Sequence, residues 1–134
     1  MPRQIKTTDT EKITINLGYV DLGRIDLLVE EGFYTNRTDF IRAAIRAQLA
    51  SHTAEVGALI ERRTLDIGLR DFSRADLEAA RAKGEVLHIK VVGLARLAPD
   101  IPTELALAVI GSINVLGALQ ATNEQRAALK DRIT

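Results

Sequence analysis

Cysteine is absent from the chain, aromatic residues make up only 4% of it, and no apolar run is long enough to cross a bilayer. The lack of cysteine excludes disulfides, thiolate catalysis and cysteine-based zinc or iron–sulfur sites, and it suits a reducing compartment. The longest apolar run, residues 105–119, is interrupted by Gly111, Ser112 and Asn114. The N-terminus also lacks the apolar region of a signal peptide. We therefore expect a cytoplasmic protein.

Neither sign of charge is in excess, since eighteen basic residues balance eighteen acidic ones. A protein that attracts nucleic acid through a general basic field usually carries a clear positive excess. Any contact with DNA would then depend on the local placement of cations such as Arg3, Lys6 and Lys12.

Motifs for catalysis or cofactor binding are also missing. None of Ser51, Ser73 and Ser112 lies in a Gly-x-Ser-x-Gly elbow, and neither a phosphate loop nor a dinucleotide fingerprint occurs. His52 and His88 are distant in the sequence and have no cysteine or paired histidine beside them, which makes a poor set of metal ligands. We predict no enzymatic activity, no metal and no other cofactor.

Near the N-terminus, after a polar and flexible arm over residues 1–10, apolar and polar residues alternate in the stretch EKITINLG at residues 11–18. Such alternation predicts a β-strand with one apolar and one polar face. The apolar face carries Ile13, Ile15 and Leu17, and the polar face carries Lys12, Thr14 and Asn16.

The next strand-like segment is dozens of residues away, so this strand needs a partner from elsewhere. Two copies of the segment, antiparallel about a twofold axis, would pair their backbones and bury both apolar faces. Folding and dimerisation would then be one event.

Two helices are predicted after this strand. The first ends at Gly32, which fits a left-handed residue just past a helix C-terminus. The second begins after Asn36, whose side chain suits an N-cap, with Asp39 three residues later as in a capping box. Its apolar stripe can be continued past His52, which would extend this helix to about residue 62.

The predicted elements follow the order strand, turn, helix, Gly32-Phe33, the run NRTDFIR at residues 36–42, and helix. This order resembles the ribbon-helix-helix family of DNA-binding repressors, in its CopG-like branch. The resemblance covers about residues 12–49, within an expected domain over residues 11–52. It implies that a ribbon formed by two chains enters the DNA major groove and that the N-terminus of the second helix sits on a phosphate. Double-stranded DNA and a second copy of the chain are the implied partners.

The outward side chains of the strand suit the reading of bases. Lys12 can donate to guanine, Asn16 can pair with adenine, and Thr14 can offer its hydroxyl or touch a thymine methyl group. At the second helix, Asn36, Arg37 and Thr38 are the predicted phosphate contacts. The alternative is that the polar strand face is simply solvated and that Asn36 and Thr38 serve as structural caps. The predicted dimer core comprises Ile13, Ile15, Leu17, Ile25, Leu28, Phe40, Ile41 and Ile45.

The remainder, residues 64–134, contains three strand-like segments at residues 64–69, 89–94 and 113–118. Helix candidates follow them, opened by Ser73, by Pro102, and by Thr122 or Asn123. Gly68, Gly93 and Gly117 lie at matching positions in the three segments, and we expect each to allow close contact between a strand and a helix. The pattern predicts a degenerate threefold strand-helix repeat that forms a small parallel sheet with helices on one face.

The expected fold is therefore α+β: an N-terminal ribbon-helix-helix domain followed by an α/β module. The expected function is that of a sequence-specific transcriptional regulator, a repressor, whose C-terminal module assembles dimers into higher oligomers or, alternatively, holds an effector. An antitoxin that represses its own operon is a second interpretation. It is weakened because 22 of the 37 residues from Glu85 to Ala121 are apolar, too many for a loose tail. A structural oligomerisation protein that does not bind DNA is a third.

Overall fold

The computed structural model describes residues 10–134, which divide into two compact units, one ending at Ala58 and one spanning Leu59–Thr134. The predicted flexible arm over residues 1–10 lies outside the described residues except for Thr10. Across residues 10–134, every helix is too short or too polar to traverse a lipid bilayer.

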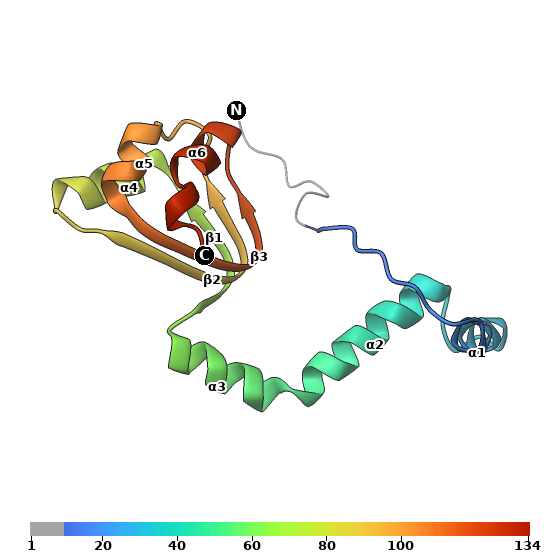
Figure 1. Cartoon of the computed structure of the whole chain (residues 1–134). Coiled ribbons are helices and arrows are strands. Elements are labelled where there is room, and N and C mark those ends of the chain that lie inside the picture. Colours follow the sequence, from blue (N-terminus) through green and yellow to red (C-terminus); the bar gives the residue numbers. More distant parts are fainter. Residues whose placement is uncertain (1–9) are drawn as a thin grey trace. The chain divides into compact units, whose positions relative to one another are not determined.

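The first unit consists of an irregular stretch over residues 11–18 followed by helices α1 (Tyr19–Glu30) and α2 (Arg37–Ser51) (Figure 1). The predicted end of α1 is confirmed. Gly32 has φ +84°, and its N–H donates to the Val29 carbonyl at 3.1 Å while the Phe33 N–H donates to the Leu28 carbonyl at 2.9 Å. This pair of bonds is a Schellman motif, which satisfies the last carbonyls of the helix and turns the chain toward α2.

The extension of α2 past His52 takes the form of a separate helix, α3 (Thr53–Arg63). On either side of His52, two hydroxyl groups bond to helix carbonyls: Ser51 Oγ donates to Gln48 at 2.6 Å, and Thr53 Oγ1 donates to Ala50 at 2.8 Å. Short hydroxyl side chains of this kind compete with the helical backbone pattern. A continuous second helix reaching residue 62 is therefore wrong.

The second unit contains a parallel sheet of three strands in the order β1 (Asp66–Phe72), β2 (Leu87–Leu97) and β3 (Ile110–Gln120). Helices α4 (Arg74–Ala82), α5 (Thr103–Val109) and α6 (Asn123–Ala128) follow the strands in turn, and a short 3-10 helix, η2 (Lys130–Arg132), comes last. The predicted parallel sheet is thus confirmed. The threefold repeat in the sequence stays a prediction.

All three helices of the second unit lie on the same side of the sheet (Figure 1). Along β2, alternate residues such as Val91 and Ala95 are buried there against Leu77 of α4 and Leu105 of α5. A strand presents alternate residues to opposite faces, so this core uses one face of the sheet. Two of the helices that cover this core start as predicted, α4 after Ser73 and α6 after Thr122. Each of these two residues forms a complete capping box.

Helix α6 is held to the rest of the unit by Gln125, whose side chain is buried. Its amide nitrogen donates to the Ala98 carbonyl at 2.9 Å and to the Ile101 carbonyl at 3.1 Å, and its amide oxygen accepts from the Thr122 N–H at 3.0 Å. A buried amide that makes all of these bonds avoids the desolvation penalty of an unpaired polar group. Helix α6 is therefore hydrogen-bonded to the loop between β2 and α5.

Gly68, Gly93 and Gly117 are in register across the three strands. All three have positive φ, and a Cβ on Gly93 would collide with the Gly68 carbonyl oxygen, as one on Gly117 would with the Gly93 carbonyl oxygen. The expected close contact between strand and helix is therefore wrong, because Gly93 and Gly117 each admit the backbone of the neighbouring strand instead. Gly68, on the edge strand, has nothing within 4 Å of such a Cβ.

This difference predicts unequal effects of Gly93→Ala and Gly68→Ala. Both substitutions impose the strain of a left-handed φ on a side chain, but only Gly93→Ala also pushes a methyl group into the adjacent strand. We expect Gly93→Ala to lower the free energy of unfolding by about 1–3 kcal/mol more than Gly68→Ala does. Urea denaturation of the two variants measures this, and equal losses would contradict the steric account.

Candidate nucleic-acid interface

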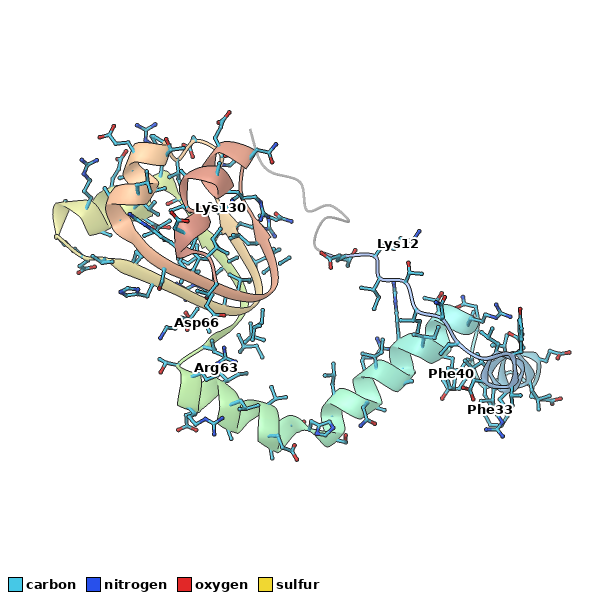
Figure 2. The ribbon with its side chains drawn as sticks, viewed as in Figure 1. Lys12, Phe33, Phe40, Arg63, Asp66 and Lys130 are labelled. Carbon is cyan, nitrogen blue, oxygen red and sulfur yellow. The ribbon has the colours of Figure 1, made fainter. Side chains whose placement is uncertain are left out.

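The stretch over residues 12–17, predicted to be a strand, pairs with no other strand among residues 10–134. No backbone hydrogen bond joins residues 11–17 to any other described residue. Its apolar face is open, with Ile13 exposed by 69% and Leu17 by 38%. Figure 2 shows Lys12 on this stretch, ahead of α1. Within residues 10–134 this stretch therefore combines unpaired backbone groups with exposed isoleucines, both of which are unfavourable in water.

An apolar groove of about 990 Å³ lies between this stretch and helices α1 and α2. All eight residues predicted for the dimer core line it. Of these eight, Ile25 of α1 is buried within the single chain, whereas Ile45 of α2 is largely exposed. Charged residues such as Asp21 and Arg42 also line the groove. The predicted core residues therefore converge on one surface, where four of them, Ile13, Ile15, Leu17 and Ile45, are exposed.

The N-terminus of α2 is capped as predicted. Asn36 Oδ1 accepts from the Asp39 backbone N–H at 2.8 Å, and Asp39 Oδ2 accepts from the Thr35 N–H at 3.0 Å. The return bond thus reaches Thr35, one residue before the N-cap, so the arrangement only approximates a capping box. Both bonds fix the direction in which the chain enters the helix.

Two donors remain at this helix end. The backbone N–H groups of Arg37 and Thr38 belong to the first turn, where a helix supplies no carbonyl partner, and they donate to no other group among residues 10–134. They lie at the positive end of the helix dipole. Two free N–H groups at such a position form a suitable seat for a phosphate.

The guanidinium of Arg37, in contrast, is already engaged. Its Nε and Nη2 donate to the two carboxylate oxygens of Asp26 on α1, both at 2.8 Å. This hydrogen-bonded guanidinium holds the pKa of the Asp26 carboxyl below its usual range. Sequence reasoning missed Asp26, since no spacing rule connects two residues on different helices.

Aromatic residues brace the turn between α1 and α2. Tyr34 and Phe40 meet edge to face, with ring centroids 5.0 Å apart and planes at 85°. Phe40 is labelled near the start of α2 in Figure 2. Phe33, which precedes Tyr34 in this turn, is largely exposed.

Neither histidine belongs to a cluster of metal ligands in the part of the chain that the structure describes. His52 lies 3.6 Å from the Glu55 carboxylate in the first unit. In the second unit, the Nδ1 of His88 lies 2.8 Å from Ser112 Oγ on the neighbouring strand.

The geometry of the first unit agrees with comparisons to known proteins. The ribbon-helix-helix transcriptional regulator family matches residues 8–126, which is most of the sequence, so the chain belongs to this family. It is also similar to the transcriptional regulator CdrS of Halobacterium salinarum, with 31% identity over 48 residues that cover 36% of this chain and 87% of that protein. Most of the chain thus lies outside that alignment. No solved structure matches the chain.

The Asp26–Arg37 ion pair predicts a specific titration behaviour. We expect Arg37→Gln to return the Asp26 pKa to its usual range, whereas Arg42→Gln, on the same helix, should leave it low. Because the folded-state pKa is depressed, the ion pair stabilises the fold above the ordinary carboxyl pKa, and this contribution is lost as the pH falls through the folded-state value. Carboxyl NMR titration of Asp26 tests this, and an unchanged midpoint in Arg37→Gln would refute it.

Proposed function

We propose that the chain is a homodimeric repressor that reads the DNA major groove with a two-stranded antiparallel ribbon. Residues 12–17 of each copy would supply one strand. The observation that carries this proposal is the open groove lined by all eight predicted core residues, beside a stretch whose backbone has no partner in the described chain.

A second copy would satisfy both deficits at once. An antiparallel neighbour of identical sequence supplies the missing donors and acceptors along residues 12–17. It would also cover Ile13, Ile15 and Leu17, whose burial is favourable by about 1.5–3 kcal/mol each before the loss of chain entropy. The dimer and the folded first unit would then form together.

In such a ribbon the polar side chains Lys12, Thr14 and Asn16 would point away from the helices, which requires Lys12 to leave the groove that it lines in the single chain. A two-stranded ribbon fits the major groove, where each base pair presents its own pattern of donors and acceptors. Lys12 would donate to guanine, and Asn16 would bond to the N6 and N7 positions of adenine. These contacts would determine which sequence is bound.

The start of α2 would position the ribbon by holding a phosphate. The free N–H groups of Arg37 and Thr38 supply the contact, while the Asp26 carboxylate occupies the guanidinium of Arg37. Contacts to phosphate carry no sequence information, so this site contributes affinity and orientation.

The alternatives from the sequence are less well supported. In the antitoxin interpretation, the C-terminal region stays loose until the toxin binds. Leu59–Thr134 instead contains an ordered sheet with a buried core. A purely structural oligomer would explain the open groove but gives no role to the free donors at the start of α2. Measurement of DNA binding distinguishes a purely structural oligomer from a repressor.

The first test is the salt dependence and sequence preference of DNA binding. The affinity of the wild-type chain for operator DNA selected from a random pool should fall linearly on a log–log plot as salt increases. Asn16→Ala should lose about 1–3 kcal/mol of discrimination between selected and random DNA, with little change in binding to random DNA. Asn123→Ala, an exposed asparagine of α6, is the matched control and should behave as the wild type. No binding to any sequence would disprove the proposal.

The phosphate seat can be tested with a matched pair at position 37. Arg37→Gln removes the guanidinium and keeps the backbone N–H, whereas Arg37→Pro removes both. Proline suits the first position of a helix, and Asn36 before it is extended, with φ −163° and ψ 179°, as a residue preceding proline prefers. We expect Arg37→Pro to weaken binding to all DNA sequences alike, by about 1.5–3 kcal/mol per protomer relative to Arg37→Gln. Equal affinities of the two variants would rule out this contact.

A further inference from the structure

The face of the sheet that points away from α4, α5 and α6 carries an apolar surface. Paired residues of neighbouring parallel strands point to the same face. Since Val91 and Ala95 of β2 are buried under the helices, Val92 and Leu94 of the same strand point to the opposite face. Their partners in register on β1 and β3 point there with them.

Two adjacent rows of side chains therefore form what we call the outer patch. One row joins Ile67, Val92 and Leu116, and the next joins Leu69, Leu94 and Ala118. None of these six residues belongs to the buried core cluster or packs against it. Ile67 is exposed by 70% and Leu116 by 47%.

Such a face is unusual for a finished protein surface. Parallel sheets almost always have both faces covered, and contiguous exposed apolar patches mark sites of interaction. Within Leu59–Thr134, the helices that follow the strands pack on the inner face and leave the outer patch open.

We propose that the outer patch binds the same patch of a second copy of the chain. The twofold axis of this contact lies between the two sheets and perpendicular to the strands. It places the row that contains Leu116 in one copy over the row that contains Ala118 in the other copy. The large Leu116 then meets the small Ala118 in both directions. On the other two strands Ile67 meets Leu69 and Val92 meets Leu94, so apolar side chains face apolar side chains across the whole contact.

Charged residues border the patch at both ends. Beyond one row lies Asp71, which is exposed 3.6 Å from a nearly buried Arg96, and beyond the other lies Lys90. Lys90 is exposed and takes part in no ion pair within residues 10–134. The twofold axis places β2 over β2, so Lys90 of one copy lies over Arg96 of the other, and the exposed Asp71 beside that Arg96 is the acidic group that offsets both cations. A single lysine at the border is, in contrast, a poor surface for nucleic acid.

The size of the patch indicates how the two copies meet. Six apolar side chains are few compared with the roughly 20–30 residues per partner of a stable free complex. A second patch held nearby reaches a local concentration on the order of millimolar, which compensates for weak contacts. The ribbon dimer would supply this tether, so the inference rests on the proposed function in that respect.

Because the chain has no cysteine, introduced thiols can report this contact directly. We co-express full-length Leu116→Cys with full-length Ala118→Cys, oxidise the purified protein mildly and separate it on a non-reducing gel. The twofold arrangement predicts a disulfide-linked dimer that contains one chain of each variant. Two chains that carry Lys130→Cys, an exposed site on η2, should stay unlinked.

A further substitution in each chain, Leu69→Lys, should abolish the cross-link, and circular dichroism would verify that the module stays folded. The same samples are examined by ultracentrifugation and DNA binding. A dimer that binds DNA but forms no link between positions 116 and 118 would overturn this inference and leave the proposed function intact. A monomer that binds no DNA would overturn both.

Discussion

The backbone of residues 11–17 finds no hydrogen-bond partner among the described residues, and the rest of the first unit depends on how that deficit is met. Helices α1 and α2 leave between them an apolar groove that their own side chains do not fill. Strands tolerate exposure of one face, but unpaired backbone together with exposed isoleucines is unfavourable, and the proposed dimer would remove both deficits. The second unit differs, because its three strands pair with one another and bury a core beneath three helices.

The N-terminus of α2 connects the architecture of the first unit to its chemistry. Asn36 and Asp39 fix the entry of the chain, and the Asp26–Arg37 ion pair ties that end of α2 to α1. The backbone donors of the first turn are thereby held in place without being used. A phosphate bound there would find its donors already oriented, which lowers the entropy lost on binding.

Local features could be read from the sequence and nonlocal ones could not. The left-handed Gly32 and the caps at Asn36 and Ser73 depend on neighbours within a few residues, and the structure has them as predicted. The same holds for the three strands of the second unit, whose apolar segments are marked by regularly spaced glycines. The contact between Gly68 and Gly93 depends on the register of two strands, which spacing alone does not determine.

The candidate site also combines features that follow from local sequence patterns with contacts that do not. The eight residues predicted for the dimer core come from the apolar periodicity of the sequence, and they line one groove in the structure. Their burial in a dimer stays a prediction. The engagement of Arg37 by Asp26 depends on how two helices lie against each other, and no local pattern encodes that. The break at His52 also escaped prediction, because an apolar stripe can continue across a point where hydroxyl side chains interrupt the backbone bonds.

The buried amide of Gln125 affects the order in which the two units can fold during synthesis. Until Gln125 has been synthesised, the Ala98 and Ile101 carbonyls lack the side-chain amide that bonds to both, so the packing of α6 against this loop stays incomplete. The N-terminal unit emerges long before that point, since chains grow at about 5–20 residues per second and domains fold as they appear. In the proposed dimer, two nascent chains on one messenger would therefore join through their N-terminal units while both sheets are still unfinished.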